Sequence, residues 1–239
     1  MKRRNLGIIL SMSVSLFCVA AQCADASGIT GSGKVKSENR KLPEYHSIKL
    51  TLPAEMIVDV GSNGDLSIEA DDNLLSHIST TVKNGTLVIS NDQPFSNLQH
   101  LHIKAKTAKL DAVSVDGAAT TTINNAAGSK FELTANGAST TTINKANCGT
   151  VSLSGNGASK VIANGKAEKL TATLNGAGDL KSAELSTKSS NISITGAGSA
   201  EVNASNDLDV TITGAGNVKY KGNPKLSKHV LGAGSVEKI

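Results

Sequence analysis

Aromatic side chains are almost missing from this 239-residue chain, which has no tryptophan, three phenylalanines and two tyrosines. Globular domains usually fill much of their core with such rings, because each ring buries a large apolar area. A chain with so few rings is expected to build its core from many small, equivalent layers. The regular placement of Val, Leu and Ile described below supports this expectation and argues against disorder.

Cysteine and net charge are also scarce. Cys18 and Cys23 lie in the N-terminal segment that we expect to be removed, so the remaining Cys148 has no partner for an internal disulfide. This excludes a disulfide-stapled secreted domain. Removal of residues 1–26 takes away three basic residues and one acidic residue, which lowers the formal net charge from +4 to about +2. So small a charge gives no argument for a nucleic-acid partner.

Residues 1–26 have the pattern of a signal peptide. A basic segment at residues 2–4 precedes an apolar stretch at residues 6–21, and an A-x-A cleavage site follows at residues 24–26. A membrane anchor is the alternative, but the stretch is short for a bilayer and is diluted by serine. No later segment is apolar enough to span a membrane. We therefore expect export to the periplasm, the cell envelope or the cell exterior.

A glycine-alanine pair recurs along the second half of the chain at intervals of 18 to 20 residues. A fixed period of this length is the signature of a repeat architecture. Glycine is expected where a tight corner needs a positive φ or leaves no room for a Cβ. The corner glycines are Gly117, Gly137, Gly157, Gly176, Gly196, Gly214 and Gly232.

The residues around each corner glycine alternate between apolar and polar. The positions two and four residues before it are mainly apolar, and so is the position four residues after it. The position three residues before it carries a hydroxyl in six of the seven units. A period of two is typical of a strand with one buried face. The outward hydroxyl row is Ser114, Thr134, Ser154, Thr173, Ser193 and Thr211.

These patterns predict an all-β protein with a β-solenoid over residues 110–239. Each of about seven coils has a strand, a tight corner, a second strand and a looser polar connection. Helices are excluded because no 3.6-residue period is present. A β-propeller is excluded because one blade needs about 40 residues, about twice the length of the repeat. Coils spaced by about 4.8 Å would give a rod roughly 30 Å long.

The part before the repeats is expected to differ. Residues 45–109 contain alternating strands and turn signals, which we interpret as N-terminal β coils or a cap over the open end of the rod. Residues 27–44 are interpreted as a flexible leader.

The segment from Tyr45 to Ile239 resembles the bacterial DUF2807 family, the putative auto-transporter adhesin head GIN domain. The resemblance lies in "YHSIKLTLPAEMIVDVGSNGDLSIEADDNLLSHI", in "GTLVIS", and in the units "NGAGDL", "TGAGSA", "TGAGNV" and "LGAGSV". It implies a right-handed, pectin-lyase-like β-helix that is exported and has an adhesion role. No catalytic residues come with the family, so none are carried over.

The outward hydroxyl row is the candidate binding face. Such a ladder offers regular hydrogen-bonding groups to a glycan or to a protein surface. The alternative is that the row has no ligand and is simply solvated. Thr120, Thr122, Thr140 and Thr142 form a second polar set past the corner. The functional prediction is an exported, adhesin-like binding module. The alternative is a periplasmic or cell-envelope scaffold, and copies could associate through the edges of the solenoid.

Catalytic and metal chemistry find little support in the sequence. The acids of the repeats are scattered, and a carbohydrate-active β-helix enzyme would need paired carboxylates or a metal site. His100 and His102 would share a strand face but have no evident third ligand. Asp179 in "NGAGDL" echoes a calcium repeat, but its counterparts in the other coils are not acidic. We predict no enzyme, cofactor or metal site.

Overall fold

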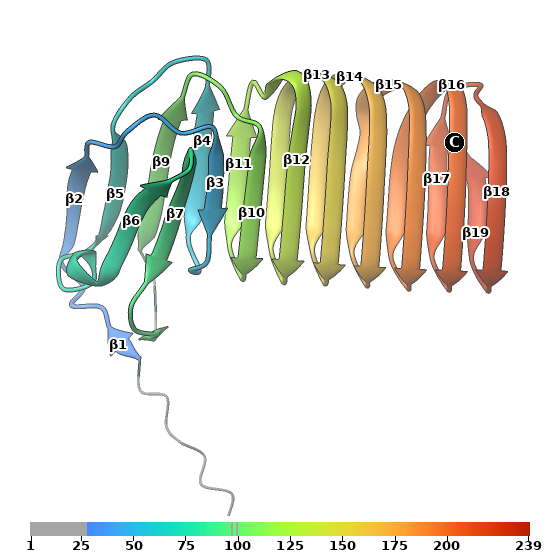
Figure 1. Ribbon diagram of the computed structural model, residues 1–239. Helices are drawn as coiled ribbons and strands as arrows, with labels where there is room; N and C mark the ends of the chain where they lie inside the picture. The colour runs from blue at the N-terminus through green and yellow to red at the C-terminus, as the bar shows by residue number, and fades with distance from the viewer. Residues whose placement is uncertain (1–27, 97, 99) are drawn as a thin grey trace, which may run out of the picture.

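The computed structural model describes residues 28–96, 98 and 100–239. Figure 1 shows a straight rod of stacked β coils with a more irregular β region at its N-terminal end. The expected signal peptide lies outside the described residues. The strands of the repeats are β10 (Ala112–Gly117), β11 (Thr120–Asn124), β12 (Ala127–Gly137), β13 (Thr140–Gly157), β14 (Lys160–Gly176), β15 (Asp179–Gly196), β16 (Ser199–Gly214), β17 (Asn217–Lys221), β18 (Lys225–Gly232) and β19 (Ser235–Lys238).

Each coil pairs with the next in parallel and in register. The seven corner glycines are consecutive register partners from Gly117 to Gly232. The solenoid has about six turns, close to the seven repeat units counted in the sequence. We use sheet 1 for the strand segments before each corner and sheet 2 for those after it. The all-β solenoid prediction is confirmed.

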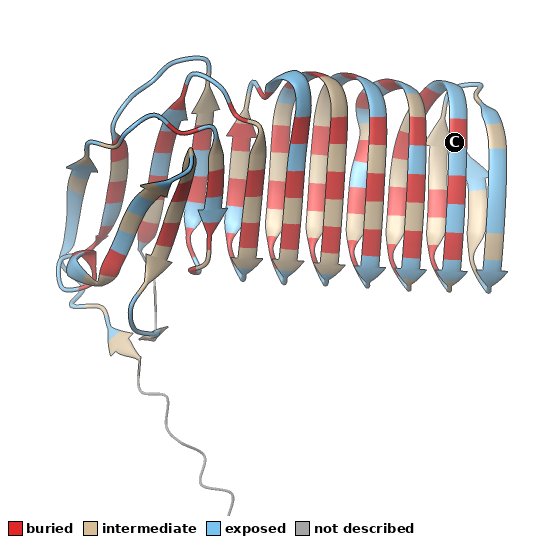
Figure 2. Ribbon diagram, viewed as in Figure 1, coloured by how far each residue is buried: buried red, intermediate tan, exposed pale blue. Residues whose placement is uncertain are grey.

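The core lies between the two sheets, and Figure 2 shows buried residues alternating with more exposed ones along the coils, except in the last coil, where β18 and β19 contain no buried residue. The predicted inward rows are buried up to the last coil, as illustrated by Leu153 and Ile192 in sheet 1 and Leu180 in sheet 2. In the last coil Val230 and Val236 are half-buried. Phe131 is the largest fully buried side chain among the described residues. The core is therefore a stack of small aliphatic layers, as the shortage of rings implied.

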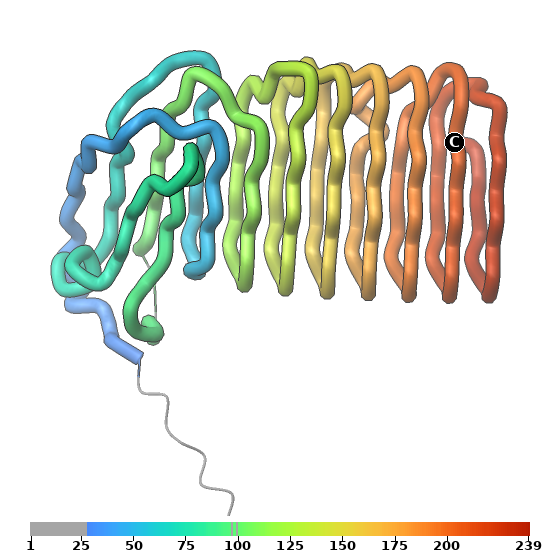
Figure 3. The backbone as a smooth tube through the Cα atoms, viewed as in Figure 1, coloured from blue at the N-terminus to red at the C-terminus, as the bar shows by residue number. Residues whose placement is uncertain are grey.

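Two kinds of bend close each coil, as the tube in Figure 3 shows. At the tight corner, Gly176 has φ of +110°, and a Cβ there would lie 2.7 Å from the carbonyl oxygen of Gly157 one coil below. Glycine is needed for both reasons. At the other bend the polar connections are paired with the next coil rather than loose, for example Cys148 with Ala167. Strands β13–β16 therefore run through this bend, with register shifts.

Asparagine ladders run along the outside of the rod. Asn136 Nδ2 donates to Asp116 Oδ1 at 2.6 Å, Asn156 to Asn136 at 2.8 Å, and Asn175 to Asn156 at 2.9 Å. All amides point the same way, so an aspartate that only accepts ends the series. A second ladder has the same form and consists of Asp59, Asn124, Asn144 and Asn164.

The N-terminal region extends both sheets and then changes direction. Sheet 1 continues through β10, β3 and β7, and sheet 2 through β11, β4 and β9, all in parallel. Antiparallel strands complete each end, β6 beside β7, and β5 and β2 beyond β9. The elements are β1 (Ile29–Thr30), β2 (Val35–Arg40), β3 (Ser47–Leu50), β4 (Glu55–Val60), β5 (Leu66–Asp71), the 3-10 helix η1 (Leu75–His77), β6 (Ile78–Lys83), β7 (Thr86–Asn91), β8 (Phe95–Ser96) and β9 (Leu101–Thr107).

Residues 28–44, the described part of the segment 27–44, differ from the flexible leader that we expected. Residues 35–40 form β2, and Arg40 donates from Nη1 to the carbonyl oxygen of Ile78 at 2.6 Å. β1 pairs in parallel with β8. These strands could not be predicted from sequence patterns, because β2 pairs with the distant strand β5 through backbone groups. None of the helices in the described part of the chain is long and apolar enough to cross a membrane.

Candidate functional site

The predicted hydroxyl row forms one straight line across sheet 1. Its six residues are register partners on adjacent strands from β10 to β16, and none of them is buried. Lys49 continues the line at its N-terminal end and His229 at its C-terminal end. The structure therefore brings the predicted residues together, and their role in binding stays a prediction.

The row is the middle of a larger uncharged grid. On β13, β14 and β15, three neighbouring rows contain only serine, threonine and asparagine, and no member is buried. Neighbours in a parallel sheet lie about 4.8 Å apart across strands and about 6.6 Å apart along a strand. The nine residues of this polar grid are Ser152, Ser154, Asn156, Thr171, Thr173, Asn175, Asn191, Ser193 and Thr195.

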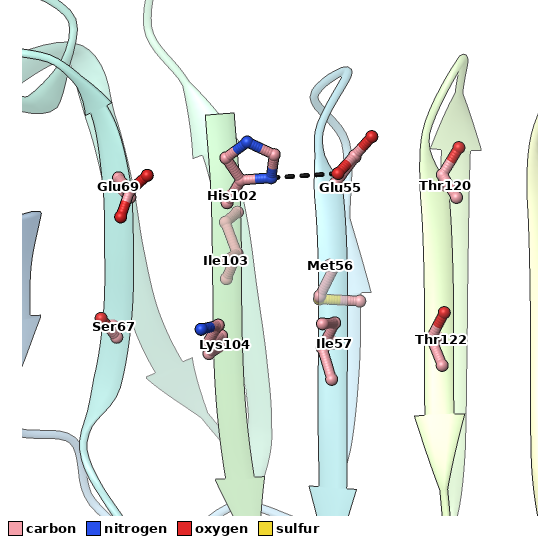
Figure 4. A pocket seen from close by; sticks show the side chains of 10 residues that line it. All are labelled: Glu55, Met56, Ile57, Ser67, Glu69, His102, Ile103, Lys104, Thr120 and Thr122. Carbon is pink, nitrogen blue, oxygen red and sulfur yellow. Dashed lines mark ion pairs between the residues drawn. The ribbon is translucent and has the colours of Figure 1, made fainter. Parts of the chain in front are cut away.

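Sheet 2 has a different surface near the N-terminal end, where a hollow of about 370 Å³ crosses four strands. Figure 4 shows its side chains side by side on β5, β9, β4 and β11. Volumes of this size suit a small ligand or one unit of a polymer. The groove is lined by Glu55, Met56, Ile57, Ser67, Glu69, His102, Ile103, Lys104, Thr120 and Thr122.

Acidic and basic groups meet at the rim of this groove. His102 Nδ1 lies 3.0 Å from Glu55 Oε2, and both side chains are well exposed. Glu69 is the register partner of His102 on the other side, and its carboxylate accepts a hydrogen bond from Ser37 Oγ at 3.3 Å. The arrangement supplies hydrogen-bonding groups of both kinds to a ligand.

The floor of the groove is apolar. Met56 and Ile103 are buried beneath it, while Ile57 points outward and is 39% exposed. A second hollow of about 240 Å³ shares Glu55 and His102 with the first and continues toward the corner of the coil. The groove therefore combines an apolar base with a charged rim.

The groove could not be predicted from the sequence. Its residues come from three separate segments, 55–57, 67–69 and 102–104, joined to Thr120 and Thr122. Of these residues, only Thr120, Thr122 and His102 stand out in the sequence patterns. The outward positions of these strands alternate with buried ones, but a single sequence does not reveal which strands become neighbours.

The histidines do not gather into a metal centre. His46 lies 3.2 Å from a carboxylate oxygen of Asp111, and His77 lies 3.0 Å from one of Asp92. His100 lies just before β9, outside the strand that carries His102. Within the described residues, no three His, Cys, Asp or Glu side chains are placed to hold a metal ion.

Two other residues singled out in the sequence have structural surroundings. Asp179 accepts a hydrogen bond from Ser199 Oγ at 2.6 Å, on the next coil. Cys148 is buried, burial raises the pKa of its thiol, and Sγ donates to the carbonyl oxygen of Ala126 at 3.4 Å. A buried thiol with a raised pKa is a poor nucleophile.

Comparison with known proteins gives a family and a set of related folds. The family described as putative auto-transporter adhesin, head GIN domain, matches residues 44–224. A solved structure from Bacteroides fragilis, named a putative adhesin, is 25% identical with a TM-score of 0.84, and the alignment covers 89% of this chain and 100% of that one. Among the curated proteins no match is found.

Two Parabacteroides structures share the fold at lower identity. A putative lipid binding protein of P. distasonis is 23% identical with a TM-score of 0.71, covering 88% of this chain and 99% of that one. A putative adhesin of P. merdae is 20% identical with a TM-score of 0.67, covering 88% of this chain and 98% of that one.

Proposed function

Because this chain belongs to the putative auto-transporter adhesin, head GIN domain family, we propose that it is an exported, non-catalytic adhesion module that binds a neutral glycan chain. The binding surface is the polar grid on sheet 1. The single observation that carries the proposal is the three-by-three array of uncharged, short side chains at regular spacing.

The chemistry of the grid favours an uncharged, hydroxyl-rich polymer. Serine and threonine hydroxyls and asparagine amides both donate and accept hydrogen bonds, as sugar hydroxyls do. Each such bond adds only about 1 kcal/mol. A polymer that contacts several coils at once gains affinity through many such contacts on one rigid surface. Short side chains also lose little conformational entropy on binding.

A charge-insertion experiment tests the surface. The double variant Thr173→Lys/Ser193→Lys places two cations in the middle of the grid. Thr142→Lys/Ile162→Lys, at register partners on neighbouring strands of sheet 2 outside the groove, is the matched control. We expect the grid variant to lose at least about tenfold in affinity for the glycans that the wild-type protein binds on an array. The control should bind as the wild type does, and circular dichroism should show both variants folded.

Equal binding by the two variants would move the site away from sheet 1. If the wild-type protein binds no glycan, adhesion through this grid is wrong. The alternative is then an envelope scaffold, whose partners cross-linking would identify.

Location is tested independently. Intact cells are treated with protease, and the protein is followed by immunoblot beside a periplasmic control. Adhesion requires that the protein is cleaved while the control survives. Protection until the outer membrane is opened supports the scaffold.

Catalysis is tested at the groove, where Glu55 and Glu69 are the carboxylates available for acid–base chemistry. We expect no glycan hydrolysis by the wild-type protein. Turnover that Glu55→Gln or Glu69→Gln abolishes would contradict the non-catalytic assignment.

A further inference from the structure

Sheet 2 carries a row of alternating charges in the C-terminal half of the rod. Lys181 on β15 is the register partner of Glu201 on β16, which pairs with Lys219 on β17 and then with Glu237 on β19. Lys181 and Glu237 are exposed, and the two inner members are half-buried. Four charges of alternating sign therefore stand on four consecutive strands, separated by about 4.8 Å.

No ion pair within the described residues includes any of these four side chains. Other charges on nearby coils do pair, as Lys221 Nζ does with Glu184 Oε1 at 2.8 Å. The four charged groups are therefore available to a partner. An alternating row of even length is complementary to itself when one copy is reversed, which is the condition for an isologous twofold contact.

We propose that this row, the charge ladder, is a contact surface for a second copy of the chain. The two rods lie face to face and antiparallel, with a twofold axis along the strands between β16 and β17. Lys181 then faces Glu237 of the second copy, and Glu201 faces Lys219 of the second copy. All four charges find an opposite charge, so the contact selects this orientation.

The neighbouring row on the same face agrees with the arrangement. It runs from Asp179 through Ser199 and Asn217 to Ser235 on the same four strands. Under the same axis Asp179 faces Ser235 of the second copy and Ser199 faces Asn217. The two serine hydroxyls already donate within their own chain, to Asp179 and to Asn217, so this row adds no clash of like charges. A twofold axis along the rod through the charge ladder would instead set each charge against its own copy.

The contact leaves sheet 1 of each copy facing outward on opposite sides of the pair. Exposed ion pairs are individually weak and are screened by salt. The association is therefore expected to be weak and to fall as ionic strength rises. A pair of this kind would present two equivalent outer faces.

Charge reversal in the whole processed chain provides the test, with self-association measured by sedimentation velocity over a concentration series. At an ionic strength of about 0.02 M, where screening is small, Lys181→Glu alone and Glu237→Lys alone should each weaken association by about tenfold or more, because each change enters the contact twice. The double variant Lys181→Glu/Glu237→Lys should recover wild-type association within about threefold. Lys166→Glu, on another side of the rod, should have no effect.

The double variant also separates this contact from a purely intrachain role. It places a glutamate beside Glu201 and a lysine beside Lys219 in the same chain, which lowers stability if the ladder only stabilises its own coil. If the double variant associates as the wild type does, although like charges within its own chain lower its stability, the result supports the contact between copies. The proposal is overturned if the wild-type chain stays monomeric at low salt, or if the double variant associates no better than the single variants.

Discussion

Two glycines at the tight corners allow a sharp test, because they share a positive φ and differ in whether a Cβ would meet a neighbouring coil. Gly176 and Gly117 both precede alanine and have positive φ, +110° and +97°. A Cβ on Gly176 would lie 2.7 Å from the carbonyl oxygen of Gly157, whereas a Cβ on Gly117 would meet nothing within 4 Å. Replacing each by alanine therefore separates backbone strain from the contact between stacked coils.

The expected loss of unfolding free energy is the sum of the backbone strain and, at Gly176, the contact between stacked coils. Alanine at positive φ costs about 1–2 kcal/mol, offset by about 0.4–1 kcal/mol because the unfolded chain loses freedom. Gly117→Ala should therefore destabilise by roughly 1 kcal/mol. Gly176→Ala must also push two coils apart, which adds about 1–3 kcal/mol, as overpacking does elsewhere.

Urea unfolding followed by circular dichroism measures the difference. With a slope of about 2–3 kcal/mol/M for a chain of this size, the midpoint of Gly176→Ala should lie roughly 0.5–1 M below that of Gly117→Ala. If the two midpoints agree within error, contact between coils does not explain the glycine at this corner.

Two further predictions concern hydrogen bonds and pH. Asn156→Ala removes a hydrogen bond donated to Asn136 and one accepted from Asn175, so it should lower the free energy of unfolding by about 1–2 kcal/mol. Asn175→Ala, at the end of the ladder, removes one such bond and should cost about half as much. Equal losses would contradict separate contributions from the two bonds. Tyr45 is buried, and burial raises its pKa from 10.0 to about 12, although its hydroxyl donates to the carbonyl oxygen of Lys106. Its folded-state pKa exceeds the unfolded value, so its contribution is complete below pH about 10 and is lost as pH rises through about 12, by about 2–3 kcal/mol. Urea titrations of the wild type and Tyr45→Phe across this range should converge, and parallel pH curves would exclude this account.

Much of the fold could be predicted because each coil repeats the same local physics. Alternation around Leu153 and Ile192 marks the buried face of a strand, since period two puts successive side chains on opposite faces. A glycine at every corner marks the bend that a Cβ would block. Each repeat supplies the same evidence again, which is why the hydroxyl row could be named before its geometry was known.

Local periodicity could not predict the parts of the structure that depend on pairing between strands far apart in the sequence. β2 lies beside β5 through backbone hydrogen bonds, which leave no trace in side-chain type. The groove arises because β5, β9, β4 and β11 become neighbours, although all three of these pairs join residues more than 30 positions apart. The polar composition of the connection at Cys148 predicts a loose bend, yet its backbone is paired with the neighbouring coils.

The sequence by itself determined the solenoid, its buried rows and its corners, because periodicity and glycine act locally and are repeated in every coil. Only the tertiary structure decided how the N-terminal strands cover the rod, where the groove lies, and that Lys181, Glu201, Lys219 and Glu237 form one alternating line. The physical reason is that register between strands depends on how successive coils stack, and the lengths of the intervening bends alone do not fix it.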